Sequence, residues 1–78
     1  RVVSVVKVKM FGVARLKTGV SEFEADVHTM DELKNSVPGM TKNEVKDLVI
    51  LVNGKAVGRW YRFNDGDEVV MLSPAGGG

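Results

Sequence analysis

Residues 65–78 read Asp-Gly-Asp-Glu-Val-Val-Met-Leu-Ser-Pro-Ala-Gly-Gly-Gly, a polar turn, an apolar run and a glycine-rich end. The turn is predicted because Gly66 can take the positive backbone angle that tight turns require. The apolar run Val-Val-Met-Leu is typical of a strand. Pro74 has no amide hydrogen for a sheet, so the strand is predicted to end before it. The sequence therefore predicts a folded domain, residues 1–72, and a flexible tail, residues 73–78.

Two further strands are predicted near the start of the chain. Between residues 5 and 10 apolar residues alternate with lysines, and between residues 21 and 28 they alternate with acids. A period of two is typical of half-buried strands. The predicted inward side chains are Val6, Val8, Met10, Phe23, Ala25 and Val27. Antiparallel pairing would place lysines opposite acids, and such pairs contribute only about 0.2–1 kcal/mol each.

Two capping boxes predict where helices begin. Thr29 and Glu32 have the spacing of the first box, and Thr41 and Glu44 that of the second. After the first box, apolar residues recur at helical spacing, and they are Met30, Leu33 and Val37. Residues 38–39, Pro-Gly, are predicted to end this helix after about two turns. A helix this short needs a surface to pack on, and the preceding strand pair would supply it.

Residues 48–52, Leu-Val-Ile-Leu-Val, are predicted to form a central strand buried on both faces, closed by an Asn53-Gly54 turn. Strands and helices in this order predict an α+β protein of two layers. The order and length look like a β-grasp, the ubiquitin-type roll. We therefore expect a mixed sheet of about four to five strands packed on one main helix.

The composition leaves little side-chain chemistry. The chain has 78 residues, no cysteine and one histidine, which excludes disulfides, thiolate metal sites and metal sites built on histidines. His28 is expected to be a solvent-facing or capping residue, and no serine has a visible base partner. The acids of residues 65–68 suggest a hairpin turn rather than a cation loop, because the other spaced oxygen ligands of a calcium loop are missing. No metal site is predicted.

The charge balance argues against nucleic acid and membranes as partners. Eleven basic and ten acidic residues give a net charge of +1, and the apolar runs are far shorter than the roughly 20 residues of a membrane span. Trp60 and its neighbours, between Arg59 and Arg62, could stack on bases, but a core edge is the favoured interpretation. No signal peptide is visible. The protein is expected to be soluble and cytoplasmic.

One reactive group remains, the α-carboxylate of Gly78. Its reference pKa of about 3.3–3.7 makes it an anion at neutral pH. The tail of residues 73–78 can extend about 20 Å from the last strand. Gly76, Gly77 and Gly78 carry no Cβ, so their backbone can enter a narrow active site, and Pro74 keeps the tail out of the sheet. These features suit a substrate or carrier used by another enzyme.

Four segments carry a resemblance to a known family, and they are residues 6–12 with Arg15 and Gly19, residues 52–57, residues 65–69, and Pro74 with Gly77 and Gly78. In this order and spacing they resemble the MoaD/ThiS family of ubiquitin-like sulfur-carrier proteins, and within it most closely the small subunits of molybdopterin synthase, the MoaD proteins. The similarity covers nearly the whole chain. Ser73-Pro74 departs from the usual Pro-Pro of the family, and Met71 or Leu72 replaces a common aromatic residue.

The resemblance implies that the chain is a carrier, not an enzyme. A MoeB-like enzyme would adenylate the Gly78 carboxylate with ATP and magnesium, which the partner uses and this chain does not bind. A persulfide donor would then produce a thiocarboxylate that donates sulfur in molybdopterin (molybdenum/tungsten cofactor) biosynthesis, with a MoaE-like large subunit in a heteromer. The alternatives are a ubiquitin-like protein modifier, a tRNA-thiolation or other sulfur carrier acting through Gly78, and a purely structural module.

The last strand bears on partner binding. Val69 and Met71 are predicted to point to one side of the sheet, and Val70 and Leu72 to the other. By the family pattern, Val70 and Leu72 are expected to be exposed and to dock the activating and acceptor enzymes. The alternative is a strand covered on both faces.

Overall fold

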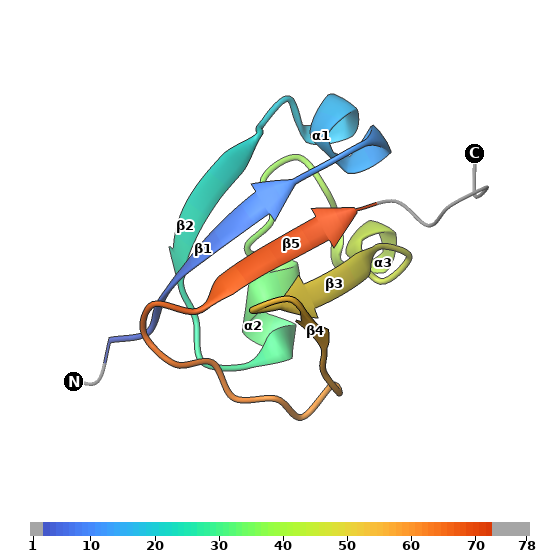
Figure 1. Cartoon of the computed structure of the whole chain (residues 1–78). Coiled ribbons are helices and arrows are strands. Elements are labelled where there is room, and N and C mark those ends of the chain that lie inside the picture. Colours follow the sequence, from blue (N-terminus) through green and yellow to red (C-terminus); the bar gives the residue numbers. More distant parts are fainter. Residues whose placement is uncertain (1–2, 73–78) are drawn as a thin grey trace.

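The alternating segments form an antiparallel hairpin at one edge of the sheet (Figure 1). The structure is a computed structural model that describes residues 3–72. In it β1 (Val5–Met10) pairs with β2 (Glu22–Asp26), and each lysine of β1 lies opposite a glutamate of β2. Val6 and Val8 have no exposed surface. The pairing and the inward face predicted for β1 are therefore confirmed.

The connection between these strands contains a helix that the sequence did not reveal. α1 (Val13–Thr18) has neither a capping side chain nor an acid in its first turn, so it lacks the usual signals of a helix start. It ends at Gly19, whose left-handed conformation (φ 72°) is typical of helix C-termini. Figure 1 shows α1 beyond the ends of β1 and β5.

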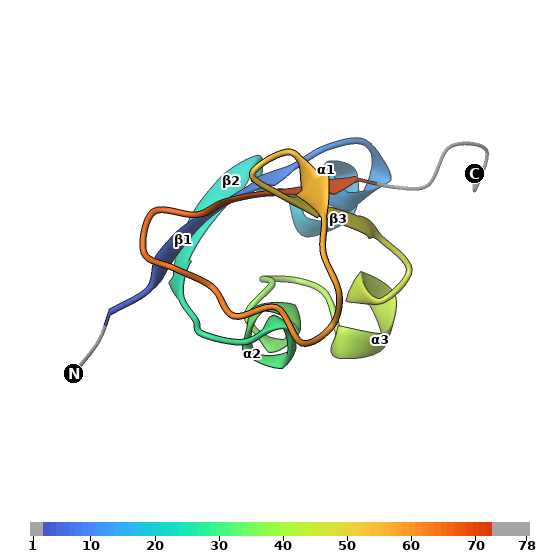
Figure 2. The same cartoon turned by 60° about the horizontal axis from the view of Figure 1, so that its bottom comes forward.

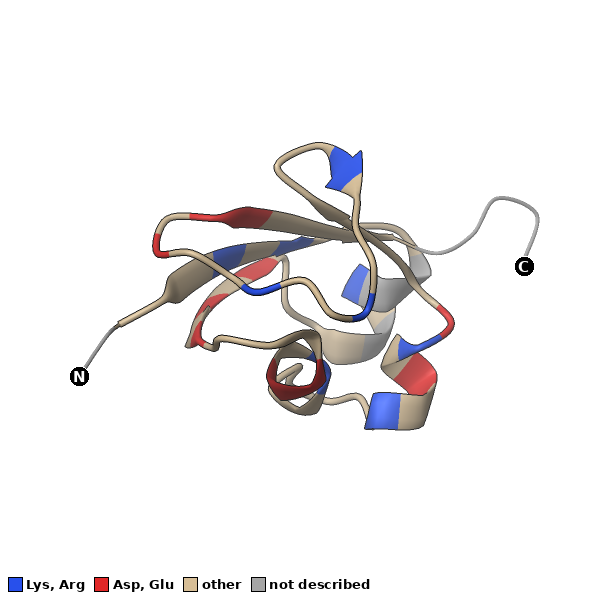
Figure 3. Ribbon diagram, turned by 90° about the horizontal axis from the view of Figure 1, so that it is seen from below, with Lys and Arg blue, Asp and Glu red and all other residues tan. Residues whose placement is uncertain are grey.

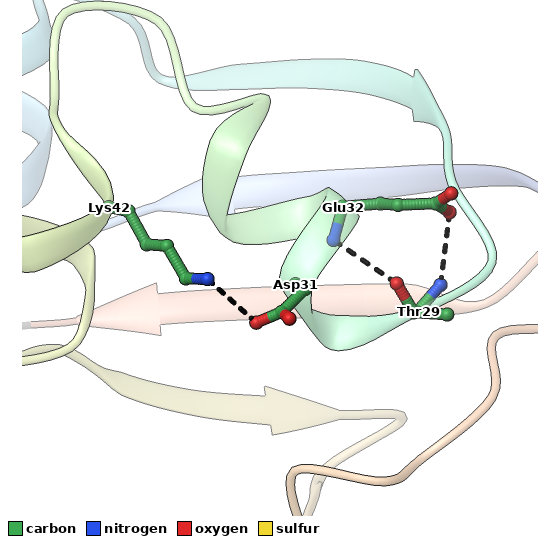
Figure 4. Close-up of polar contacts among 4 residues, drawn as sticks. All are labelled: Thr29, Asp31, Glu32 and Lys42. Atoms are coloured by element: carbon green, nitrogen blue, oxygen red, sulfur yellow. Dashed lines mark hydrogen bonds and ion pairs between the residues drawn. The ribbon is translucent and has the colours of Figure 1, made fainter.

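Two more short helices, α2 (Met30–Asn35) and α3 (Lys42–Val45), cover one face of the sheet (Figure 2). Both predicted capping boxes are present. In the first, the Thr29 hydroxyl accepts from the Glu32 amide and the Glu32 carboxylate accepts from the Thr29 amide, both at 3.2 Å (Figure 4). The helical layer is thus divided between two helices, of which α2 is the longer.

The sheet has five strands in the order β2-β1-β5-β3-β4. β3 (Val49–Val52) and β4 (Lys55–Ala56) form a hairpin, and β5 (Glu68–Leu72) lies between β1 and β3. β5 runs parallel to β1 and antiparallel to β3. At the hairpin turn both Asn53 (φ 52°) and Gly54 (φ 83°) have positive backbone angles, as two-residue turns of this kind require, which confirms the predicted turn.

The prediction that residues 48–52 form the central strand, buried on both faces, is wrong. β5 is central, and β3 lies one place from the edge of the sheet. Val49 is 39% exposed, because the described helices cover one face of the sheet only (Figure 2). An apolar run alone cannot distinguish a strand covered on both faces from one with an apolar outer face.

The core lies between the sheet and the helices. Its buried apolar side chains are Val6, Val8, Met10, Val27, Met30, Leu33, Val37, Val45, Val52, Phe63, Val69 and Met71. This two-layer arrangement of a mixed sheet and short helices is the predicted α+β, β-grasp roll. All helices in the described part of the chain are too short and too polar to span a bilayer.

Candidate functional site

The strand that leads into the tail is held in the middle of the sheet. β5 pairs with β1 on one side and with β3 on the other. Val69 and Met71 have no exposed surface and fix its inner face in the core. Where the pairing of β5 with β1 ends, the Phe11 amide donates to the Met71 carbonyl at 2.9 Å. The end of β5 is therefore a platform that is paired on both sides and buried on its inner face.

An apolar surface, the outer patch, lies on the opposite face of this platform and comprises Val49, Leu51, Val70 and Leu72. Leu72 lies directly opposite Val49, and Val70 opposite Leu51, so each pair shares one face of the sheet. Val70 and Leu72 lie opposite to the core face and are half-buried rather than fully exposed. That they bind partners remains a prediction, because no partner is present.

Two exposed apolar residues near this end of the sheet were not singled out from the sequence. Phe11, just after β1, is 49% exposed, and Leu16 of α1 is 83% exposed. Because Met10 pairs with Met71, Phe11 lies at the end of the sheet where β5 finishes. The alternation that turns Lys7 and Lys9 outward could have identified Phe11, since it continues the same series. The exposure of Leu16 could have been predicted only if α1 had been recognised in the sequence.

The remaining predicted site residues, Pro74, Gly76, Gly77 and Gly78, lie outside the described residues. The boundary between domain and tail at residues 72 and 73 likewise remains a prediction.

A serine and the only histidine lie side by side, which the sequence analysis missed. The Ser4 hydroxyl and His28 Nδ1 are 3.1 Å apart, so the expectation that no serine has a base partner is wrong. The two residues are 24 positions apart, and only the β1–β2 pairing brings them together. Ser4 is buried, with 3% of its surface exposed, so its hydroxyl cannot meet a substrate. The contact ties the start of β1 to the turn before α2.

Asp67 is the centre of a buried hydrogen-bond network. Its carboxylate accepts from the Tyr61 hydroxyl at 2.8 Å, the Asn64 amide at 2.9 Å and the Asn53 side chain at 3.0 Å. Burial acts to raise the pKa of Asp67, but these three hydrogen bonds outweigh it and hold the pKa below its ordinary value. The Asn53 side chain also accepts from the Glu68 amide at 3.0 Å. Asp67 thereby joins the β3–β4 turn to the loop before β5.

This network explains the acids that precede β5. Asp67 stabilises the turn by accepting from the Asn64 amide. The Asp65 carboxylate accepts from the Val5 amide at 2.8 Å. Across residues 3–72 no three histidine or acidic side chains gather as metal ligands would. The turn interpretation of residues 65–68 is therefore supported by direct contacts.

The aromatic segment divides between core and surface. Phe63 is buried and makes an edge-to-face contact with Tyr61 at 5.2 Å between ring centroids. Trp60, in contrast, is 83% exposed, with the Arg59 guanidinium 5.3 Å from its ring centre. The favoured interpretation as a core edge therefore holds for Phe63 and not for Trp60.

Comparisons with known proteins agree with this fold. A Pyrococcus furiosus protein assigned as molybdopterin converting factor, subunit 1, is 26% identical, with a TM-score of 0.77 over 92% of this chain and 99% of that one. Small archaeal modifier protein 1 of Methanosarcina acetivorans is 24% identical, with a TM-score of 0.75 over 97% and 98%. Urm1 of Trypanosoma brucei is 20% identical, with a TM-score of 0.61 over 97% of each chain. No protein of curated function matches the sequence.

The family is shown by the sequence itself. Residues 8–78 match the model of the ThiS family, a match that runs from β1 through β5 and includes the glycines of the tail. The β-grasp architecture, the central position of β5 and the position of the tail after it are all consistent with this match. The chain belongs to the ThiS family.

Proposed function

We propose that this protein is a sulfur carrier for molybdopterin biosynthesis and that it acts through the α-carboxylate of Gly78. The observation that carries the proposal is the family match, which extends through residue 78 and so beyond β5, the strand held in the centre of the sheet. The structural likeness to the Pyrococcus furiosus protein favours the molybdopterin pathway within the family. The proposal requires Gly78 to be the last residue of the active chain.

The chemistry would take place at the tail, on partner enzymes. A MoeB-like enzyme, using ATP and magnesium, would join the Gly78 carboxylate to AMP with release of pyrophosphate. A persulfide sulfur would then displace AMP to give an acyl disulfide. A thiol reductant would cleave its sulfur–sulfur bond, which leaves the thiocarboxylate and forms a disulfide between the thiol and the sulfur donor. A MoaE-like synthase subunit would receive the charged tail. Because the partner enzyme would use ATP, the proposed reaction would take place in the cytoplasm.

The domain would supply docking and reach rather than catalysis. The outer patch lies at the end of β5 from which the tail departs, so an enzyme that covers it would have the tail close to its active site. Exposed apolar surface of this kind is typical of protein-binding sites. Phe11 would extend the same contact at the end of β1.

Intact-mass measurement tests the proposal directly. The protein is incubated with ATP, magnesium, an activating enzyme of the MoeB type, a persulfide donor and a thiol reductant. We expect the mass to rise by the difference between one sulfur and one oxygen, with the change located on the C-terminal peptide. Omission of ATP should leave the mass unchanged. An unchanged mass with the complete mixture would contradict the proposal.

The second candidate is a ubiquitin-like protein modifier acting through the same residue. It is favoured by the structural likeness to the small archaeal modifier proteins of Methanosarcina acetivorans and Haloferax volcanii. An isopeptide bond between Gly78 and a lysine would identify this activity in the peptides of a digested cell extract. Both activities begin with adenylation, so a thiocarboxylate without conjugates distinguishes the carrier from the modifier.

Replacing Leu72 by aspartate should separate partner binding from folding. Leu72 is half-buried on the outer face, so we expect the free energy of unfolding to fall by only about 1 kcal/mol. Binding to the activating enzyme should weaken at least tenfold, roughly the loss expected at a central apolar contact. Titration calorimetry and urea denaturation measure the two effects.

The control for this variant is Ser21→Asp, which adds the same charge at an exposed position just before β2. It should leave both binding and stability close to wild type. If Leu72→Asp instead unfolds the protein, the residue serves the core and its assignment to the outer patch is wrong.

A further inference from the structure

A hollow, the cationic groove, lies where α2 and the segment after α3 meet β3 and the segment after β4. It has a volume of about 200 Å³. Its apolar lining residues, here called the floor, are Met30, Leu48, Ile50 and Val57. Ile50 pairs with Met71 and so faces the helical layer, on the opposite side of the sheet from the outer patch. The two surfaces are therefore distinct.

The floor is accessible because β4 is short. β4 pairs only with Leu51 and Val52, which leaves Val49 and Ile50 without a strand partner on that side of β3. Gly58 lines the groove and adds no bulk. An apolar floor beside an unpaired strand edge is the arrangement that accepts an extended peptide.

The rim of the groove is positively charged. It comprises Lys34, Lys46 and Arg59, and no acidic residue lines this hollow. An adjoining hollow of about 370 Å³ shares these three cations and adds Lys42 and Asp31. Asp31 is already paired with Lys42 at 3.0 Å, as Figure 4 shows. Within residues 3–72, the three rim cations have no ion-pair partner.

The positive charge of this cluster affects the pKa of Asp31. The pKa of Asp31 is lowered first by the hydrogen bond and charge of Lys42, and further by the charges of Arg59 and Lys34. Figure 3, which views the molecule from below, shows basic residues on α3 and on the loop between β4 and β5. The lining of the cationic groove holds three cations and no acid, whereas the acidic residue on α3, which Figure 3 also shows, is not among its lining residues.

We propose that the cationic groove binds an extended acidic segment of a partner protein, with one apolar side chain of that segment in the floor. The floor fits an aliphatic or aromatic side chain, and the three rim cations fit flanking carboxylates. Nucleic acid fits less well, because the floor has no aromatic ring on which a base could stack. A small anion such as phosphate would leave the apolar floor uncovered.

This interaction goes beyond the proposed sulfur transfer. The groove is separate from the outer patch and the tail, so a partner could occupy it while the tail is engaged elsewhere. Failure of the binding test below would not affect the formation of a thiocarboxylate at Gly78, and failure of sulfur transfer would not affect peptide binding.

The test uses a short fluorescent peptide of aspartates and glutamates around a central leucine, titrated with the full-length protein. We expect saturable binding that weakens with salt, and NMR shifts centred on Leu48, Ile50 and Val57. Lys46→Glu should weaken binding roughly tenfold, because the introduced carboxylate repels the acidic peptide. Lys55→Glu, the same charge reversal on β4 outside the groove, should leave the affinity unchanged.

A second variant, Gly58→Glu, tests the groove without removing any native side chain. A Cβ at Gly58 would meet no atom within 4 Å, so the fold should tolerate the change. Its carboxylate should repel the peptide. The proposal is overturned if a peptide with serine in place of leucine binds equally well, if inorganic phosphate or an oligonucleotide competes fully at equal charge, or if the NMR shifts centre on Val70 and Leu72 rather than on the groove.

Discussion

Replacing Asp67 by alanine is expected to lower the free energy of unfolding by about 3 kcal/mol, because hydrogen bonds to a charged group contribute about 1.5–3 kcal/mol each. Asp67 is 7% exposed and accepts three such bonds, from Tyr61, Asn53 and Asn64. The variant leaves all three donors without their acceptor. Part of the loss is regained where water can reach a donor, which is why the expected value is below the sum.

Urea denaturation followed by circular dichroism measures this loss. The matched control is Tyr61→Phe, which removes one of the three bonds and keeps the ring contact with Phe63. It should cost about 1.5 kcal/mol, the value of a single hydrogen bond to a charged group. If Asp67→Ala is no more destabilising than Tyr61→Phe, the network is not cooperative and Asp67 is not its centre.

The difference in stability between wild type and Asp67→Ala should depend on pH in a defined direction. The pKa of Asp67 is lowered in the folded protein, so its ionised form stabilises the fold above the ordinary value of about 3.9. This stabilisation is lost as the pH falls through the folded-state pKa. The difference in stability between wild type and Asp67→Ala should therefore be full at neutral pH and shrink in strong acid.

Deletion of Gly78 is expected to abolish thiocarboxylate formation without changing the melting temperature. The shortened tail would present its carboxylate roughly 3.5 Å nearer the domain, which is enough to misplace a reacting atom. Within residues 3–72 the buried core ends at Met71, and the tail is predicted to lie outside the folded domain, so the melting temperature should not respond. Intact mass after the activation reaction and a thermal melt measure the two effects.

The control for this deletion is Gly76→Ala, which keeps both the length of the tail and the terminal glycine pair. Retained activity is expected, because the family resemblance rests on Gly77 and Gly78 and not on Gly76. A melting temperature that drops after deletion of Gly78 would contradict the view of the tail as independent of the core.

The sequence predicted those parts of the fold that rest on local chemistry. The alternation of residues 5–10, the two capping boxes and the Asn53-Gly54 turn each act over a few residues, and each is present. α1 was missed because its limits are set by glycine backbone geometry and not by capping side chains. The place of β3 was wrong because strand order depends on contacts between distant segments.

The candidate site likewise has features that local sequence predicts and features that depend on contacts between distant segments. The inward and outward sides of β5 followed from alternation, but the contributions of Phe11 and Val49 to the apolar surface required the register between strands. The contact between Ser4 and His28 and the network around Asp67 likewise join residues far apart in the chain. The cationic groove was invisible in the sequence, because its cations are interspersed with acids along the chain and only the fold gathers them.

The position of β5 also governs how the protein can be made. β1 and β5, the first and last strands, are parallel neighbours, and without β5 the hairpins β1–β2 and β3–β4 have no strand to join them. Contacts between such distant segments form late, because a long loop must close first. A chain halted or cleaved before β5 would therefore remain unassembled. Because the tail follows β5 in the sequence, the end proposed to react is synthesised only after all the described strands, so an incomplete chain would lack the group that the proposed activating enzyme uses.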